Sequence, residues 1–314
     1  MVKTLSLEDC HLYAIDSPVD LARRLGTSVS TLESLANADD GYKLWTNKDG
    51  REVEEPRPEL QRLHAKVHRY LSRVMAPTFL HSPVKHRSYV TNAKAHTIGG
   101  PSVKIDIRKF FQSVPKAAVR RFFREDMRCK GDAAEILAKL LTFNGHLPTG
   151  SSSSPILAYY GFRRMFGEIA AYADANGLIV TCYVDDITVT GSVNLGQTVR
   201  ELQSIIARAG LRSHKVKMFP AGRAKIITGV VVEGALVKLP NKRHRAIAAK
   251  FDELDAAVTA DEELGVLNGL LSRLHEAGMI EPAFKARARS MERRRKEVRQ
   301  RLANAPAGQG HNLP

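Results

Sequence analysis

Two adjacent carboxylates, Asp185 and Asp186, are the residues of this sequence best suited to chemistry. They lie between two apolar, β-branched segments, 178–184 and 187–190, and Gly191 follows the second segment. Such segments are typical of strands, and Asp is tolerated in turns because its short side chain accepts hydrogen bonds from nearby amides. The stretch therefore predicts a β-hairpin with both acids at its tip.

Neighbouring carboxylates repel each other, so a fold that holds them together favours a cation between them, such as a divalent ion with oxygen ligands. The simpler interpretation, a solvated Asp-Asp turn, applies to most such pairs. A third acid favours the metal here, because Asp106 lies in an alternating segment between Ile105 and Ile107, where a carboxylate needs a partner. That partner is either a nearby Lys or Arg or a shared cation. Three acids around two cations is the arrangement that two-metal phosphoryl transfer requires.

A loop rich in Gly and Ser, 147–154, lies between these acids in the sequence. Its small residues let the backbone approach a substrate closely, and its amides can face an anion. Alone it would be interpreted as a linker. However, Pro155 opens an apolar segment that predicts one helix to about Ala175, with Gly177 as its stop. The loop is therefore expected to face a substrate.

The chain has 314 residues and a net charge of +15, from 48 Lys and Arg against 33 Asp and Glu. A basic excess of this size indicates a polyanionic partner, nucleic acid rather than membrane. No apolar run reaches membrane-spanning length and the N-terminus has no secretory signal, so a cytoplasmic protein is expected. Cys10, Cys129 and Cys182 form no metal-binding or disulfide pattern.

The N-terminal part of the chain predicts helices interrupted by one hairpin. Two short helices are expected before residue 41 and another over 58–74, and Lys48-Asp49-Gly50 predicts the turn of the hairpin between them. Lys48 and Arg51 are either plain surface charges or ligands of a phosphate, for which Arg is well suited. Ser113 is expected to cap a helix that follows the Asp106 strand.

From about Lys238 the sequence becomes basic and predicts three helices, at about 242–258, 261–276 and 282–303. The basic residues of the third helix include Arg293, Arg294 and Arg295. A charge run is usually a solvated face, but this density favours binding to RNA or to an RNA–DNA hybrid. The tail, 304–314, is rich in Gly and Pro and is predicted to be disordered.

Taken in order, these motifs resemble those of reverse transcriptases over roughly Tyr42 to Leu239. The elements that carry the resemblance are Arg51 with Pro56, Asp106 with Phe111, Leu147-Pro148-Thr149-Gly150 with Ser154-Pro155, Tyr183-Val184-Asp185-Asp186, and Gly210-Leu211 followed by Lys217. Two further elements resemble those of bacterial retron reverse transcriptases: Asn92-Ala93-Lys94-Ala95-His96, and Ile227-Thr228-Gly229, in which Ile replaces Val. Thr149 and Val184 depart from the family pattern, because many relatives have Gln and Ala there.

The resemblance implies a fold, α+β, of the right-hand polymerase type. Its implied parts are an N-terminal helical segment (1–41), fingers (42–102, with part of 116–160), a palm of antiparallel sheet and helices (103–239), a basic helical thumb (240–303) and the tail (304–314). No ribonuclease H, endonuclease or protease segment is expected beside them.

The resemblance also implies roles for single residues. Asp106, Asp185 and Asp186 would bind two Mg²⁺ ions and catalyse DNA synthesis, with Lys217 as general acid. Residues implied to contact the nucleotide are Lys48, Arg51, Phe111, Thr149, Gly150 and Tyr183, and Phe111 would also exclude a ribose 2′-OH. Residues implied to contact RNA are Asn92, His96, Ile227, Thr228, Gly229, Arg293, Arg294 and Arg295.

By the same resemblance, the enzyme would copy part of one structured non-coding RNA (msr-msd) with dNTPs. It would start from a guanosine 2′-OH and yield a branched msDNA, the cDNA joined to its RNA. An effector protein would be its partner in anti-phage defence, with no membrane involved. Two alternatives stay open: another bacterial reverse transcriptase, of the group II intron-like or abortive-infection type, and a non-catalytic RNA-binding scaffold. The three acids disfavour the scaffold, and the Asn92 and His96 element disfavours the other enzymes.

Overall fold

The computed structural model describes residues 4–38, 40–192 and 194–304. The chain divides into two compact units, Met1–Arg223 and Ala224–Pro314. The second unit begins before residue 240, so the strands within 224–239, which the sequence assigned to the palm, group with the C-terminal helices.

Helices make up much of the first unit. In chain order they are α1 (Pro18–Leu25), α2 (Val29–Ala36), α3 (Pro58–Leu71), α4 (Tyr89–Lys94), α5 (Lys116–Arg121), α6 (Gly131–Leu140), α7 (Ser154–Gly161), α8 (Arg163–Ala175) and α9 (Leu195–Arg208). The first two confirm the predicted N-terminal pair. Ser17 Oγ accepts a hydrogen bond from the Asp20 amide at 3.2 Å, and Gly26 ends α1 with a left-handed φ of 62°.

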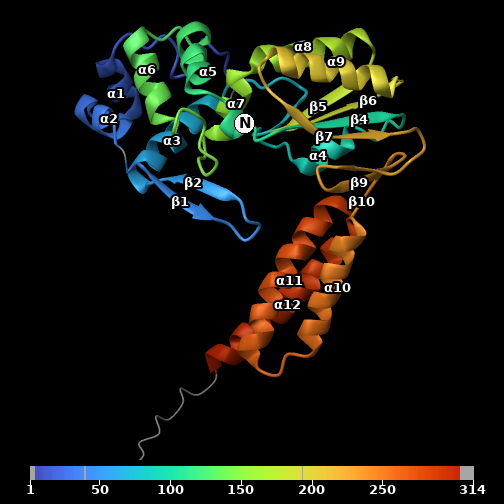
Figure 1. Ribbon diagram of the computed structural model, residues 1–314. Coiled ribbons are helices and arrows are strands. Elements are labelled where there is room, and N and C mark those ends of the chain that lie inside the picture. Colours follow the sequence, from blue (N-terminus) through green and yellow to red (C-terminus); the bar gives the residue numbers. More distant parts are fainter. Residues whose placement is uncertain (1–3, 39, 193, 305–314) are drawn as a thin grey trace, which may run out of the picture. The chain divides into compact units, whose positions relative to one another are not determined.

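The first unit contains a five-stranded sheet, which lies to one side of α1, α2 and α6 (Figure 1). Its strands are β3 (Leu80–Ser82), β4 (Ser102–Ile107), β5 (Ile179–Tyr183), β6 (Asp186–Thr190) and β7 (Ser213–Phe219). Their order is β3-β5-β6-β4-β7, and every pair is antiparallel except β3 with β5.

The two faces of this sheet differ in chemistry. Val103, Ile105 and Ile107 of β4 are fully buried in the core, and α8 and α9 cover one face of the sheet (Figure 1). Side chains alternate along a strand, so Lys104 and Asp106 lie on the opposite face. The sheet thus presents a polar face on which acids and cations of several strands can meet.

A separate two-stranded sheet consists of β1 (Tyr42–Thr46) and β2 (Glu52–Pro56), and it confirms the predicted hairpin. Asn47 Oδ1 accepts hydrogen bonds from the amides of Asp49 and Arg51 at 3.0 and 2.9 Å, which fixes the turn.

Two local predictions are wrong. The apolar segment after Pro155 forms two helices, because Phe162 leaves helical geometry, with a φ of −121°, between α7 and α8. Ser113 does not cap a helix: it ends a short 3₁₀ helix, Phe111–Ser113, and α5 follows Pro115 without a side-chain cap.

The second unit contains a small sheet and three helices. The strands are β8 (Lys225–Ile227), β9 (Val230–Glu233) and β10 (Leu236–Lys238), in the order β10-β9-β8. The helices are α10 (Asn241–Asp255), α11 (Ala260–Ile280) and α12 (Ala283–Asn304), which confirm the three predicted helices with shifted ends. Of the predicted disordered tail, Asn304 ends α12, and 305–314 lie outside the described residues.

Candidate active site

The hairpin that carries the paired acids is formed by β5 and β6, as predicted, but the acids sit differently. Val184 and Asp185 form the two-residue turn, whereas Asp186 is already the first residue of β6 and pairs with Tyr183. Val184 has a φ of 59°, a left-handed conformation that a β-branched residue rarely adopts. Such strain persists only where the surrounding structure imposes it, and it is concentrated at functional sites.

The β-sheet register brings the third acid to this hairpin. Asp106 of β4 pairs directly with Asp186 of β6. The amide of Ile107 donates a hydrogen bond to the carbonyl of Asp185 at 3.0 Å, which ties the turn to the end of β4. Asp106, which is far from the other two in the sequence, therefore lies with Asp185 and Asp186 at one end of the sheet.

Asp185 and Asp106 both have raised pKa values. Burial, reinforced by the charges of Asp106 and Asp186, raises the pKa of Asp185 to about 6. Burial also raises the pKa of Asp106, against the lowering effect of nearby His214, Lys215 and Lys104. Both shifts show that the fold holds these carboxylates where their ionised forms are disfavoured.

Two basic side chains, Lys104 and His214, lie close to these carboxylates. Lys104 Nζ lies 2.9 Å from Asp186 Oδ2. His214 Nδ1 lies 2.8 Å from Asp106 Oδ1, at ion-pair distance but outside hydrogen-bond geometry. Sequence reasoning missed both residues. Lys104 was detectable, since it precedes Asp106 by two residues and so shares its face of the strand; His214 is revealed only by the pairing of β4 with β7.

Among the described residues, no group of three His, Cys, Asp or Glu side chains is arranged as a closed metal site. The donor chemistry nevertheless fits a divalent cation, because Asp106 and Asp185 are oxygen donors whose pKa values are both raised, mainly by burial, and the charge of Asp106 adds to the shift of Asp185. Asp186 faces Lys104, which already supplies it with a positive charge. Asp106 and Asp185 are thus the better pair of metal ligands.

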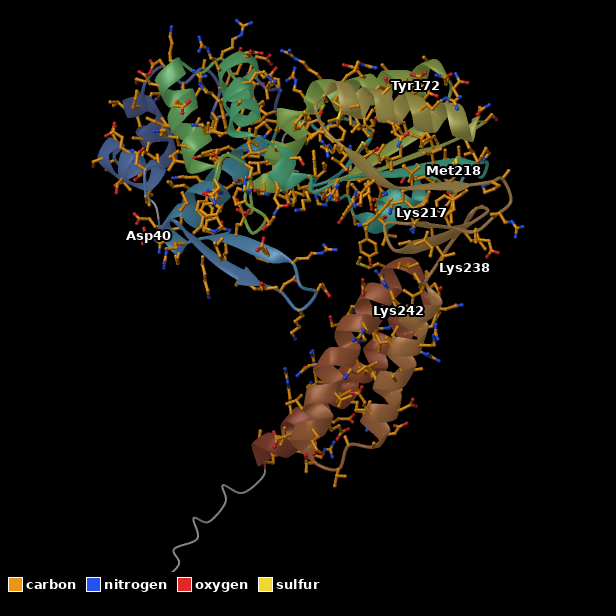
Figure 2. All side chains as sticks on the ribbon, in the orientation of Figure 1. Asp40, Tyr172, Lys217, Met218, Lys238 and Lys242 are labelled. Carbon is orange, nitrogen blue, oxygen red and sulfur yellow. The ribbon has the colours of Figure 1, made fainter. Side chains whose placement is uncertain are left out.

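The predicted general acid, Lys217, lies on β7 on the side of the sheet away from α8 and α9 (Figure 2). It is exposed and pairs with Lys104 rather than with Asp106. An irregularity in the pairing of β4 with β7 falls between these positions, and Lys215 within it has a φ of 50°. The charge of Lys215 acts on Asp106, so Lys215 is a cation at this site that the sequence motif did not identify.

The Gly/Ser-rich loop is bound to the hairpin strand β2. Thr149 Oγ1 accepts a hydrogen bond from the Glu54 amide at 3.0 Å and donates to the Glu52 carbonyl at 3.2 Å, while the Thr149 amide donates to Glu54 Oε2 at 3.1 Å. The Gly150 amide donates to the Glu54 carbonyl at 3.0 Å, and a Cβ on Gly150 would lie 2.8 Å from that oxygen. The Thr149 side chain therefore joins the loop to β2 instead of lying free for a nucleotide.

A buried histidine holds the rest of this loop, which the sequence did not indicate. His64 of α3 lies with Nε2 2.7 Å from the Leu140 carbonyl and with Nδ1 2.5 Å from Ser151 Oγ and 3.1 Å from Ser153 Oγ. Burial lowers the pKa of His64 to about 4, so the ring is neutral, with Nε2 as donor and Nδ1 as acceptor. The geometry anchors the loop to α3 and α6.

The other residues expected to contact the nucleotide occupy varied positions. Lys48 and Arg51 are exposed at the turn of the β1–β2 hairpin. Phe111 is half-buried just beyond β4 and stacks on the buried Phe110 with ring centroids 6.3 Å apart. Tyr183 is half-buried at the end of β5, next to the turn.

Asn92 and His96 are buried, with relative exposures of 1% and 0%, so neither side chain is available for direct contact with RNA. His96 lies between two strands of the polar sheet face, with Nδ1 2.8 Å from Thr190 Oγ1 and Nε2 2.7 Å from Thr181 Oγ1. The expectation of direct RNA binding needs correction here, because both side chains are buried and His96 contacts hydroxyl groups of the β5–β6 hairpin.

The Ile227-Thr228-Gly229 element forms the tight connection between β8 and β9. Ile227 is fully buried, which excludes its side chain from direct RNA contact, whereas Thr228 and Gly229 are half-buried and both have positive φ, 44° and 78°. Arg243 packs against the turn, with Nη2 3.1 Å from the position of a Cβ on Gly229.

The three arginines predicted to bind RNA differ in their surroundings. Arg293 is exposed. Arg294 Nε donates to Glu263 Oε1 of α11 at 2.6 Å, and Arg295 Nη1 lies 3.4 Å from Asn268 Oδ1. Glu263 is buried and also accepts from Arg301 at 2.6 Å, so Arg294 neutralises an acid within the helical unit. Only Arg293 of the three is fully turned to solvent among the described side chains.

In the part of the chain that the structure describes, no helix is both long and apolar enough to cross a membrane.

Comparison with known proteins gives a consistent result. Residues 42–223 match the family described as reverse transcriptase (RNA-dependent DNA polymerase). The retron Ec86 reverse transcriptase of Escherichia coli is 27% identical over 275 residues, covering 83% of this chain and 85% of that protein. The retron Ec48 reverse transcriptase of Escherichia coli is 27% identical over 259 residues, covering 74% of this chain but only 63% of that protein. A foamy viral protease-reverse transcriptase, solved with double-stranded DNA, matches 72% of this chain and 34% of its own, at 14% identity and a TM-score of 0.40.

Proposed function

The chain belongs to the reverse transcriptase family and is an RNA-directed DNA polymerase of the bacterial retron type, and from this premise we propose that Asp106, Asp185 and Asp186 carry its polymerase chemistry. The observation that supports the proposal is the register that pairs Asp106 with Asp186 beside the Asp185 turn. A non-catalytic scaffold has no need to hold Asp106 and Asp185 where burial and neighbouring carboxylates disfavour their ionised forms, with a third carboxylate beside them.

Enzymes of this family use divalent metal ions. In this chain the proposed ions are two Mg²⁺, held mainly by Asp106 and Asp185, with Asp186 assisting once Lys104 moves from it. Divalent ions bound there lower the pKa of the attacking hydroxyl and neutralise charge on the triphosphate. The raised pKa of Asp185 supports this proposal, because a bound cation would favour the ionised form that burial disfavours.

The proposed nucleotide site uses groups around these acids. Lys48 and Arg51, exposed on the β1–β2 hairpin, hold the triphosphate, and Phe111 packs under the sugar and excludes a 2′-OH. Gly150 and Tyr183 line the site. Thr149 contributes indirectly, because its hydrogen bonds to β2 hold the Gly/Ser-rich loop in place. Lys217 was the motif candidate for donating a proton to the leaving pyrophosphate; Lys215, whose charge acts on Asp106, is the second candidate.

The proposed substrate is one structured non-coding RNA of the msr-msd kind, copied with dNTPs from a guanosine 2′-OH into branched msDNA in the cytoplasm. The support is the Asn92 and His96 element, the Ile227-Thr228-Gly229 turn and the retron relatives. Arg293 and its exposed neighbours on α12 supply sequence-independent affinity for phosphates, and the Thr228 and Gly229 turn contributes to selection by shape. We also propose that the protein acts in anti-phage defence together with an effector protein.

The test is purification of the chain from its host, sequencing of the bound nucleic acid, and treatment of the product with a debranching enzyme. A branched product on one dominant RNA supports the proposal. Extension only from ordinary 3′ ends, with no preferred RNA, contradicts the retron substrate and leaves a generic reverse transcriptase. In parallel, Asp185→Asn is assayed for dNTP incorporation with Mg²⁺; near-normal incorporation contradicts the catalytic assignment.

A further inference from the structure

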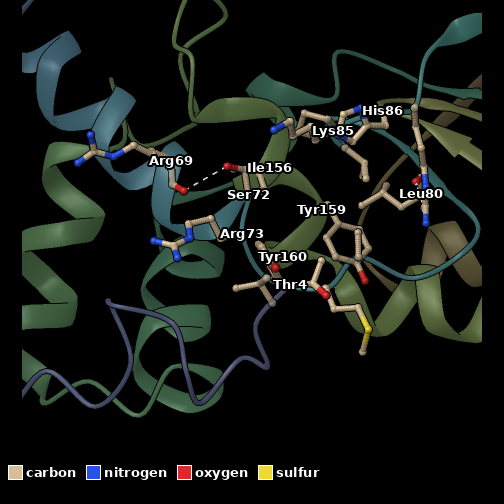
Figure 3. A pocket seen from close by; sticks show the side chains of 16 residues that line it. Thr4, Arg69, Ser72, Arg73, Leu80, Lys85, His86, Ile156, Tyr159 and Tyr160 are labelled. Atoms are coloured by element: carbon tan, nitrogen blue, oxygen red, sulfur yellow. Dashed lines mark hydrogen bonds between the residues drawn. The ribbon is translucent and has the colours of Figure 1, made fainter. Parts of the chain in front are cut away.

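A pocket of about 660 Å³ opens beside β3, the edge strand of the five-stranded sheet (Figure 3). Its walls come from the end of α3 and the turn after it, from β3 and residues 83–87, from α7, and from Thr4. None of the lining residues belongs to the groups proposed above for polymerase chemistry. Pockets of 300–1,000 Å³ are of the size that accommodates small organic ligands, including a nucleotide.

The floor of the pocket is apolar and aromatic. Val74, Leu80, Ile156 and Tyr160 are buried, and the half-buried ring of Tyr159 lies among them. Tyr159 is held by rings on its far side, with its centroid 5.7 Å from that of Phe166. A fixed aromatic ring on an apolar surface is a platform on which an unpaired base stacks, whatever its identity.

Every charged side chain that lines the pocket is basic, and none of the described Asp or Glu residues lines it. The charged residues are Arg69, Arg73, Lys85 and Arg87, and the imidazole of His86 lies beside them. Arg69 and Arg73 lie on one side of the view, and Lys85 and His86 lie on another, above Tyr159 (Figure 3). Such a rim is complementary to phosphates.

The basic residues differ in whether the protein already binds them. Arg87 Nη1 donates hydrogen bonds to the carbonyls of Pro77, Thr78 and Leu80 at 2.5, 3.2 and 2.5 Å, so Arg87 stabilises the pocket wall. Arg73 and Lys85 are exposed, and no carboxylate among the described residues forms an ion pair with either of them. They remain available for a ligand.

We propose that this pocket binds one unpaired nucleotide of single-stranded RNA, with its base against Tyr159 and Ile156 and its flanking phosphates at Arg73 and Lys85. The proposal rests on the proposed function, in which the chain works on RNA. The location suits that work, because β3 pairs with β5, which ends at Tyr183 beside the carboxylate turn.

The first experiment locates the contact on the full chain. A single-stranded 12-nucleotide RNA with a central 4-thiouridine is bound, irradiated and mapped by mass spectrometry. Crosslinks to peptides that contain 72–87 or 156–160 are expected. Crosslinks confined to other peptides overturn the proposal.

The second experiment separates charge from the base platform. Arg73→Ala with Lys85→Ala removes two phosphate contacts, so the slope of log K against log salt should fall by about 1.4 for single-stranded RNA. Arg124→Ala with Arg200→Ala removes two exposed charges outside the pocket and should change the slope less. Ala76→Phe fills the pocket without altering charge. It should leave the slope unchanged, weaken binding of single-stranded RNA about tenfold and leave binding of an RNA duplex unchanged.

Equal losses in the two double variants, or normal binding by an Ala76→Phe protein that unfolds at the wild-type temperature, overturn the proposal. Competition by free uridine monophosphate as strong as that of the oligonucleotide also overturns it, since the ligand is then a free nucleotide. Primer extension on the same preparations separates the two proposals. If the protein crosslinks through the pocket but does not extend a primer, only the polymerase assignment is contradicted. If the protein extends a primer normally and Ala76→Phe leaves its RNA binding unchanged, only the pocket proposal is contradicted.

Discussion

Asp185→Asn should make the metal-free protein more stable at neutral pH while abolishing DNA synthesis. The pKa of Asp185 is about 6 in the folded chain against an ordinary value of 3.8, so folding favours its protonated form. This favourable contribution is complete below pH 3.8 and is lost as the pH rises through 6. At pH 7.5 the ionised carboxylate costs about 3 kcal/mol, from a shift of roughly 2 pKa units at 1.36 kcal/mol each. Asn cannot ionise and avoids this cost.

The measurement is the free energy of unfolding in urea with EDTA present, at several pH values. The stability gain of Asp185→Asn should approach about 3 kcal/mol at pH 7.5, fall to about half of that at pH 5 and to about 0.5 kcal/mol at pH 4. Asp174→Asn, at an exposed position of α8, is the matched control and should stay within about 0.5 kcal/mol of wild type. Adding Mg²⁺ should stabilise wild type more than Asp185→Asn. A variant that is less stable than wild type at pH 7.5, or a gain independent of pH, would refute the reasoning.

Three further substitutions examine neighbouring parts of the site. Gly150→Ala places a Cβ 2.8 Å from the Glu54 carbonyl and 2.9 Å from Val53 Cγ1, so it should destabilise the loop and raise KM for dNTPs. Gly167→Ala, where nothing lies within 4 Å, should be neutral or stabilising by up to about 1 kcal/mol, and equal effects of the two contradict the close packing of the loop on β2. Lys217→Ala should lower kcat about 100-fold and more than Lys215→Ala does; the reverse order gives the general-acid role to Lys215. Phe111→Ala should admit ribonucleotides, seen as a lower dNTP/rNTP ratio of kcat/KM, and an unchanged ratio means that Phe111 serves only packing.

The sequence predicted those parts of the site that depend on local pattern. The β5–β6 hairpin follows from two β-branched segments around the acids, and the placement of Asp106 beside it follows from an alternating strand that contains a carboxylate. The pairing of Asp106 with His214 was not predictable, because it depends on the register of β4 with β7 and on the irregularity near Lys215. Local patterns do not determine which strands become neighbours.

The sequence was least informative about buried polar side chains. His64 holds the Gly/Ser-rich loop, yet a histidine on the apolar face of a helix carries no sign of its partners. His96 and Arg294 were interpreted as RNA ligands because of their motif and their charge, but both find partners within the protein. A buried polar group must be satisfied, and only the tertiary structure shows by which atom.

The boundary between the compact units has a consequence for building chimeras. Thr228 and Gly229 lie in the same unit as α10, α11 and α12, because that unit begins at Ala224. A graft joined between Arg223 and Ala224 therefore transfers the turn and the arginine-bearing helix together and keeps the Arg243 packing on Gly229 intact. A graft joined near residue 240 would take the β8–β10 sheet and its turn from one protein and the helices α10, α11 and α12 from the other. We therefore expect a chimera of two retron enzymes to acquire the RNA preference of the C-terminal donor when it is joined between Arg223 and Ala224, and not when it is joined near residue 240.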